Sequence, residues 1–159
     1  PYWVSYPDMA LLAGGVPVII PSDDAHRCKI SVADLEKHIT TKSKLFVINS
    51  PSNPSGIAYT KEELTELGKV LEKHKNIIVI TDDIYEHIMF GGQKFTNILN
   101  TTPSLKDRTV VLNGVSKVYS MTGWRIGYAA GPSEIVKAMT NIQSQITSNP
   151  SSISQAAAE

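Results

Sequence analysis

The sequence predicts an α/β domain of three layers, with helices packed on both sides of a mainly parallel sheet. Three continuous apolar runs indicate buried parallel strands over residues 44–50, 76–83 and 109–115. A helical repeat of apolar residues separates the first two runs and is clearest over residues 60–75. Strands that alternate with amphipathic helices are typical of strand–helix–strand units, which build parallel sheets.

Two further elements are predicted before these strands. The short β-branched run "VPVII", residues 16–20, is interpreted as a first strand. Residues 31–39 are predicted to form a helix because Ser31 can cap it and Asp34 lies in its first turn. The helix over residues 60–75 has the clearest start.

In the helix predicted over residues 60–75, Thr60 stands at the cap position, and Glu63 completes a capping box three residues later. Residues 87–95, with their paired glycines, are interpreted as a small hairpin or loop. A further strand is predicted over residues 125–132. A long helix capped by Ser133 should follow over residues 133–147, and the last residues, "SISQAAAE", indicate the start of another helix.

The amino-acid composition excludes several classes of protein. The chain has 159 residues, 42% of them hydrophobic, which is enough for one domain with a core. Lys plus Arg equals Asp plus Glu at 15 each, so no basic field for nucleic acid and no polybasic membrane anchor is expected. The single cysteine, Cys28, excludes an internal disulfide and favours the reducing cytoplasm. No apolar run reaches the roughly 18 residues of a membrane span.

Common site motifs do not occur. The sequence contains no G-x-G-x-x-G or G-x-x-x-x-G-K-[ST] phosphate loop and no G-x-S-x-G nucleophile elbow. The four histidines are far apart and lack metal-ligand spacing, so no metal site is predicted. The chain starts without Met and stops within a helical pattern, which suggests a piece of a longer protein.

Polar clusters follow the three apolar strands. "NSPSNPSG" comes after the first, "DDIYEH" after the second and "NGVSK" after the third. The carboxyl ends of parallel strands meet at one edge of a sheet, where ligands bind. Lys117 and Arg125 belong to the last cluster and its continuation, and buried cations are costly without a partner. The sequence therefore predicts a site here for an anion or an electrophile.

The motifs "NPSG", "DDIY" and "SKVYSMTGWRIGY", in this order and spacing, resemble the class I aminotransferases. These are pyridoxal-phosphate (PLP) enzymes of the aspartate aminotransferase fold, or fold type I. "PYWVSYP" resembles the bacterial aspartate aminotransferase branch, and the resemblance covers residues 1–159. It implies a partial large domain, the central part of the PLP-binding domain, without the N-terminal and C-terminal segments of the small domain.

The resemblance implies a role for three residues around the last strands. Lys117 would form the imine with the cofactor, which requires an amine that is partly desolvated or placed beside other cations. Arg125 would hold the cofactor phosphate with two guanidinium nitrogens, together with the hydroxyl of Ser116. The alternatives are a surface lysine, an arginine in a buried ion pair and a serine that only shapes the turn.

Four more cofactor-binding residues are implied. Asp82 would pair with the pyridine nitrogen, Tyr85 and Asn53 would donate to the phenolic oxygen, and Trp3 would stack on the ring. Asn53 and Trp3 would also meet the substrate. The alternatives are a helix cap for Asp82, turn chemistry for Asn53 and core packing for Trp3. The spacing to the tyrosine favours Asp82 over its neighbour. No site role is expected for Tyr2, Tyr6, Tyr119 or Trp124.

The implied reaction is transamination between an amino acid, aspartate by expectation, and a 2-oxo acid, 2-oxoglutarate by expectation. The full-length enzyme is expected to be a cytoplasmic homodimer of amino-acid metabolism. The arginine that grips the substrate carboxylate and the glycine-rich cap of the phosphate are expected outside residues 1–159. The chain alone should therefore be inactive, with weak or no cofactor binding.

Three alternatives remain open at this point. The same motifs occur in other PLP enzymes of this fold, such as carbon–sulfur lyases or cyclopropane-forming synthases. From outside the enzymes, the chain could be an aminotransferase-like ligand-sensing domain of a regulator. The third alternative is an α/β scaffold that binds no pyridoxal phosphate.

Overall fold

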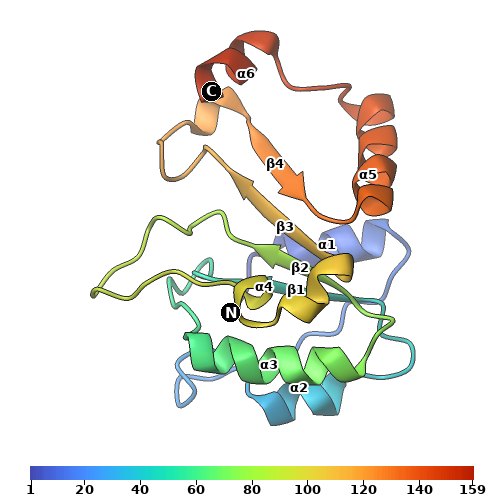
Figure 1. Ribbon diagram of the computed structural model, residues 1–159, viewed down its shortest axis with the longest axis vertical. Coiled ribbons are helices and arrows are strands. Elements are labelled where there is room, and N and C mark those ends of the chain that lie inside the picture. The colour runs from blue at the N-terminus through green and yellow to red at the C-terminus, as the bar shows by residue number, and fades with distance from the viewer.

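The computed structural model describes residues 1–159, and its strands form one four-stranded sheet in the order β1-β2-β3-β4 (Figure 1). These strands are β1 (Leu45–Asn49), β2 (Ile78–Asp82), β3 (Thr109–Gly114) and β4 (Gly127–Ala130). β1 pairs with β2, and β2 with β3, in parallel, whereas β4 runs antiparallel to β3. The predicted mainly parallel sheet is confirmed, with an antiparallel edge strand.

Helices connect and flank these strands. Both predicted capping boxes form: Ser31 with Asp34 before α2, and Thr60 with Glu63 before α3, so each helix starts one residue after its cap. The α-helices and 3-10 helices (η) are α1 (Ser5–Leu12), α2 (Val32–His38), α3 (Lys61–Lys73), α4 (Ile98–Thr101), η1 (Pro103–Arg108), η2 (Thr122–Trp124), α5 (Ser133–Ile146) and α6 (Ser152–Ala158).

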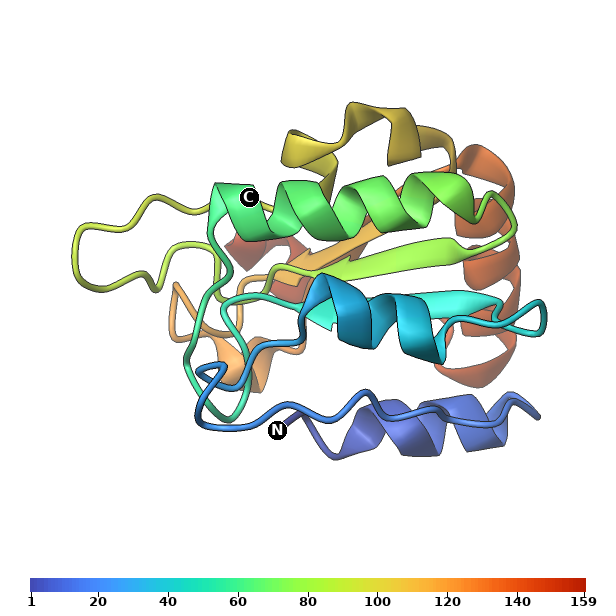
Figure 2. The same ribbon diagram turned by 90° about the horizontal axis from the view of Figure 1, so that it is seen from below.

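The hydrophobic core lies between one face of the sheet and the helices α2, α3, α4 and η1. Along β1 and β2 every second side chain is buried, as the two-residue repeat of a strand requires. The apolar side of α3 packs over this face (Figure 2). The core cluster comprises Leu35, Phe46, Ile48, Leu64, Leu67, Val70, Leu71, Ile77, Val79, Ile98 and Leu105.

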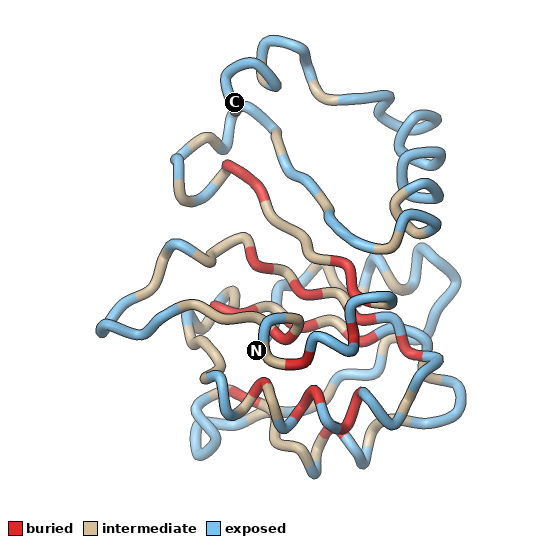
Figure 3. The backbone as a smooth tube through the Cα atoms, viewed as in Figure 1, coloured by how far each residue is buried: buried red, intermediate tan, exposed pale blue.

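The opposite face of the sheet is less covered. α1 lies on this side, as Figure 1 shows, and its Tyr6 hydroxyl reaches Asp82 at the end of β2. The layer order is therefore α1, sheet and α2–α4, which gives the three layers that the sequence predicts. Figure 3 shows that α5 and α6 are almost entirely exposed. Neither helix has a buried residue, although α5 carries large apolar side chains such as Ile142 and Ile146.

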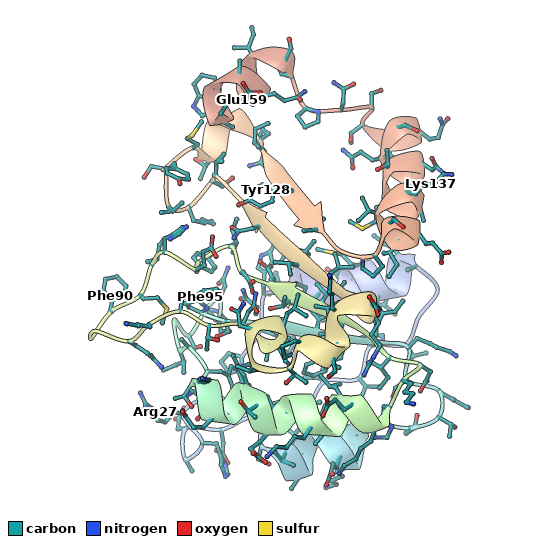
Figure 4. All side chains as sticks on the ribbon, viewed as in Figure 1. Arg27, Phe90, Phe95, Tyr128, Lys137 and Glu159 are labelled. Atoms are coloured by element: carbon teal, nitrogen blue, oxygen red, sulfur yellow. The ribbon has the colours of Figure 1, made fainter.

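Two local predictions were wrong, and a third had left two readings open. Residues 16–20 form no strand, because Pro17 lacks a backbone donor and no neighbouring strand pairs with this segment. Of the two readings given for residues 87–95, the structure shows a loop, with Phe90 82% exposed at its outer end (Figure 4). Ser133 does not cap α5, since Pro132 holds the cap position and no side chain accepts a bond there.

None of the helices combines the length and the apolar character that crossing a membrane would require.

A close contact between α3 and the segment before η1 gives the first prediction. A Cβ on Gly68 would lie 1.9 Å from Oγ1 and 2.8 Å from Cβ of the buried Thr102. An alanine normally favours a helix over glycine by about 1 kcal/mol. We expect Gly68→Ala to destabilise instead, by about 1–3 kcal/mol, because the side chain overpacks this contact.

The measurement is the urea midpoint of the protein that contains this chain. Lys69→Ala, at the exposed neighbouring position of α3, is the control and should change stability by less than about 0.5 kcal/mol. A Gly68→Ala variant that is as stable as the parent, or more stable, would contradict the expectation.

Candidate active site

The strand register brings the three polar clusters to one edge of the sheet. Asn49, the last residue of β1, lies beside Asp82, the last residue of β2, and Asp82 lies beside Leu112 of β3. The segments that follow these strands therefore leave the sheet at neighbouring points. The sequence prediction that these clusters share one edge is confirmed.

Asp82 is held by contacts to both of its carboxylate oxygens. The Tyr6 hydroxyl donates to Oδ2 over 2.6 Å, and the backbone N–H of Ile84 donates to Oδ1 over 3.2 Å. The main-chain oxygen of Asp82 accepts from Asn49 Nδ2 at 2.9 Å. The carboxylate thus has a fixed orientation on the less covered face of the sheet.

Its neighbour Asp83 points to the other side. Asp83 is 1% exposed and accepts hydrogen bonds from Thr81 Oγ1 and Asn97 Nδ2, both over 2.6 Å. Burial raises the pKa of the Asp83 carboxyl above its ordinary value, although both hydrogen bonds act in the opposite direction. The two adjacent acids therefore differ in environment: Asp83 ties the core side together, and Asp82 is accessible from the site.

Asn53, Tyr85 and Lys117 lie together above the same edge. Asn53 Nδ2 stands 3.5 Å from the Tyr85 hydroxyl, and the Lys117 amine lies 5.6 Å from the centre of the Tyr85 ring. An ammonium at this distance from an aromatic face is attracted to it. These contacts join residues from three segments that the sequence keeps far apart.

The loop that carries Asn53 is fixed by its own hydrogen bonds. The backbone N–H of Asn53 donates to Asn49 Oδ1 at 2.8 Å, and Gly56 N donates to the Ser52 carbonyl at 2.7 Å. Gly56 has a φ of +69°, a left-handed conformation that favours glycine. Asn53 thus takes part in a turn, as its alternative reading proposed, and its side-chain amide still reaches Tyr85.

Ser116, Lys117 and Arg125 belong to the loop that joins β3 to β4. Val115 N donates to the Ile126 carbonyl at 3.4 Å and closes the neck of this loop. Ser116 and Arg125 are the next residues inside the neck, so the antiparallel pairing brings them close in space. Arg125 has a φ of +57°, which is uncommon outside glycine, and its Nη1 donates to the Thr122 carbonyl at 2.9 Å.

Trp3 lies just before α1 and packs edge-on against Tyr6. The ring centres are 5.4 Å apart and the planes meet at 89°, a favourable arrangement for two aromatic rings. Trp3 is 40% exposed, so packing occupies only part of its surface. The contact connects Trp3 through Tyr6 to Asp82.

The structure differs from expectation at the two cations. Lys117 and Arg125 are both exposed, and neither pairs with a carboxylate. Within residues 1–159 only the Tyr85 ring lies against the Lys117 amine, because its turn follows β3 at the edge of the sheet. The alternative of a buried ion pair for Arg125 is also wrong.

Two residues near Asp82 have no role in the sequence prediction. Asn49 bonds both Asp82 and Asn53, and its place at the end of a strand in register with Asp82 is a signal that could have identified it. Tyr6 stands three residues after Trp3, the spacing of one helical turn. That spacing alone does not indicate a partner 76 residues away.

A hollow of about 210 Å³ lies apart from these residues. Arg27 and Lys29 line it together with Gly56, Ile57 and Phe90. The Lys29 amine is already paired with Glu63 over 2.6 Å, so the hollow offers no free buried cation. The hydrogen-bonded edge rather than this hollow is therefore the better candidate for chemistry.

A family model described as "Aminotransferase class I and II" matches residues 1–159. The chain belongs to this family. It is 61% identical over its full length to the aspartate/prephenate aminotransferase of Nitrosomonas europaea, and 54% identical over 98% of its length to the aspartate aminotransferase of Bacillus subtilis. The resemblance that the motifs indicated is confirmed.

Solved structures of aminotransferases share the fold. The aspartate aminotransferase from Rhizobium meliloti matches 99% of the chain with a TM-score of 0.96 and 48% identity. An aromatic aminotransferase from Pyrococcus horikoshii matches 99% of the chain with a TM-score of 0.94 and 37% identity. The chain is thus a partial α/β domain of the PLP-dependent aminotransferase fold.

The aminotransferase chain covers only part of these relatives. It spans 40% of the Nitrosomonas enzyme, 39% of the Bacillus enzyme, and 39% and 42% of the two solved chains. The remainder of those proteins has no counterpart within residues 1–159.

The buried Asp83 gives a prediction about pH. Its pKa is raised from the ordinary 3.8 by burial, so its contribution to stability is present at low pH and is lost as the pH rises through the raised pKa. Asp83→Asn cannot ionise. The difference in unfolding free energy, parent minus Asp83→Asn, should therefore fall as the pH rises above about 4, by roughly 1.4 kcal/mol for each unit of pKa elevation.

Urea unfolding of the apoprotein at several pH values measures this difference. A difference that stays constant or grows with pH would contradict the prediction, because ionised Asp83 would then not destabilise the folded protein.

Proposed function

We propose that the chain is part of a longer PLP-dependent aminotransferase that transfers an amino group between aspartate and a 2-oxo acid, 2-oxoglutarate. The observation that carries this proposal is the group of Asn53, Tyr85 and Lys117 at one edge of the sheet, next to Asp82. The relatives named above support the proposal, because three of the four are named for aspartate.

The donor set fits the chemistry of this cofactor. A lysine amine, a carboxylate with a fixed orientation, two hydrogen-bond donors and a guanidinium are the groups that an aldehyde, a pyridine nitrogen, a phenolic oxygen and a phosphate require. When bound, pyridoxal phosphate supplies an electrophilic carbon for the lysine and a ring that accepts electrons from the substrate.

Lys117 would provide the nucleophile and the proton carrier. Its amine is exposed and lies over the Tyr85 ring rather than in an ion pair, so it is accessible to an aldehyde. With cofactor and substrate bound, Nζ would also be the group that carries the proton of the substrate's α-carbon. The exposed setting in this chain leaves the amine able to move between these positions.

Asp82, Tyr85 and Asn53 would set the charge of the ring. The Asp82 carboxylate would keep the pyridine nitrogen protonated, and its orientation is fixed by Tyr6 and Ile84. The Tyr85 hydroxyl and the Asn53 amide, 3.5 Å apart, would donate to the phenolic oxygen. Trp3 would stack on the ring with its exposed surface, and Trp3 and Asn53 would also meet the substrate.

Arg125 and Ser116 would hold the phosphate. Both lie just inside the neck that Val115 and Ile126 close, so their side chains start from adjacent points. The Arg125 guanidinium uses one nitrogen for the Thr122 carbonyl and keeps other donors for phosphate oxygens. Because it is not engaged by a carboxylate, no internal ion pair has to break.

We further propose that residues 1–159 are the central part of the PLP-binding large domain of a cytoplasmic homodimer. The coverage of about 40% of the relatives supports a longer protein. The exposed apolar side chains of α1 and α5 support further covering of this surface in the whole enzyme.

Removal of the lysine tests the cofactor chemistry. In the full-length protein, added pyridoxal phosphate should give an absorption band near the visible edge, and Lys117→Ala should lose it because no amine remains for the imine. The rate of transamination should fall by roughly 10²–10⁴-fold. Absorption spectra and a coupled assay measure both effects.

Lys137→Ala, at an exposed position on α5, is the matched control and should keep the band (Figure 4). The proposal fails if the parent protein shows no band, or if the band persists in Lys117→Ala.

Amino-acid specificity requires a separate test, because an aromatic aminotransferase has nearly the same fold. In single-turnover reactions of the full-length enzyme, we expect aspartate with 2-oxoglutarate to react fastest among the natural amino acids. Loss of the cofactor band on mixing provides the measurement. Turnover of aromatic amino acids alone would contradict the assignment to aspartate.

A further inference from the structure

Tyr6 contacts the carboxylate that the proposed chemistry depends on. Its hydroxyl donates to Asp82 Oδ2 over 2.6 Å, in a partly buried contact between residues 76 positions apart in the sequence. Hydrogen bonds to a charged acceptor are shorter and about twice as strong as bonds between neutral groups. The contact is therefore a specific hydrogen bond and not a chance approach of two surface side chains.

Each oxygen of the Asp82 carboxylate accepts one hydrogen bond within the chain. Oδ1 accepts from Ile84 N, and Oδ2 accepts from Tyr6. Each carboxylate oxygen has two lone pairs, so each has one acceptor position left. Two donors on two different oxygens fix the rotation of the carboxylate, which one donor alone would not do.

Tyr6 also ties Asp82 to Trp3. Its ring meets the Trp3 ring edge-on at 5.4 Å, and its backbone N–H donates to the Trp3 carbonyl at 3.2 Å. Displacement of Tyr6 would therefore disturb both the carboxylate and the indole. One residue at the start of α1 connects the two side chains that would meet the edge and the face of a flat ring.

We propose that Tyr6 is a positioning residue, whose O–H holds the Asp82 carboxylate in one orientation for a protonated pyridine nitrogen. This inference rests on the proposed function. It gives α1 a part in the chemistry. If Tyr6 only packed against Trp3, its ring would be enough and its hydroxyl would not be needed.

The phenol is suited to this task over a wide pH range. Burial, together with the hydrogen bond and the charge of Asp82, holds the pKa of the Tyr6 phenol far above its ordinary value of 10. Tyr6 therefore remains a neutral donor under physiological conditions. No cation competes for the Asp82 carboxylate, since its contacts are the Tyr6 hydroxyl and the Ile84 backbone N–H, and the Asn49 amide donates to the main-chain oxygen of Asp82 instead.

Tyr6→Phe in the full-length enzyme tests the inference, because it keeps the ring and removes only the hydroxyl. We expect the dissociation constant for pyridoxal phosphate to rise about tenfold. The pH midpoint of the absorption band of the lysine-bound cofactor should also rise, by roughly half a pH unit or more, since less positive charge remains on the ring nitrogen.

Fluorescence titration of the apoenzyme and a spectrophotometric pH titration measure these two quantities. Tyr2→Phe, in the same segment, is the matched control, since the Tyr2 side chain is 44% exposed and lies outside the contacts described. It should leave both values within about twofold or 0.1 pH unit of the parent.

The pH midpoint decides between positioning and packing. A Tyr6→Phe enzyme with the midpoint of the parent overturns the inference, whether or not its thermal stability or cofactor affinity falls, because a packing contact does not change the charge on the ring. A raised pH midpoint in the Tyr6→Phe enzyme supports the inference. If the parent protein forms no band with pyridoxal phosphate, the proposed function and this inference fall together.

Discussion

The parallel pairing of β1, β2 and β3 is the constraint on which the candidate site depends. Parallel strands end at the same edge, so Asn49 and Asp82 are neighbours although 33 residues separate them in the sequence. The loops that carry Asn53, Tyr85 and Lys117 start from that edge. Long-range strand pairing, rather than local sequence, therefore assembles the chemistry, and the helices contribute by burying the face that keeps the strands paired.

The two faces of the sheet have different tasks. Phe46, Ile48 and Val79 pack with α3 and supply the core, whereas Asp82 and Asn49 point away from it. The two-residue repeat of a strand makes this division possible along one segment. It also explains why two adjacent acids can have different environments. Asp83 is buried on the core side and accepts two hydrogen bonds there, whereas Asp82 is accessible from the other face.

The fold was largely predictable because its strongest signals are periodic. Buried strands and capped amphipathic helices leave marks within a few residues, and α3 matches its prediction almost to its ends. Residues 16–20 failed because β-branched composition does not reveal whether a partner strand exists. The shared edge of the site followed from topology. The exposure of Lys117 and the Tyr6–Asp82 bond did not, since both depend on which distant side chains meet.

The hairpin from β3 to β4 has a consequence for how this protein can change during evolution. Gly114 pairs with Gly127, and the neck closes at Val115 and Ile126, so the ends of the loop are fixed by backbone hydrogen bonds. The separation of Ser116 and Arg125 is then independent of what the tip contains. Side-chain replacements at the exposed tip can therefore alter the surface that it presents, whereas the Thr122 carbonyl has to stay in place because Arg125 Nη1 donates to it.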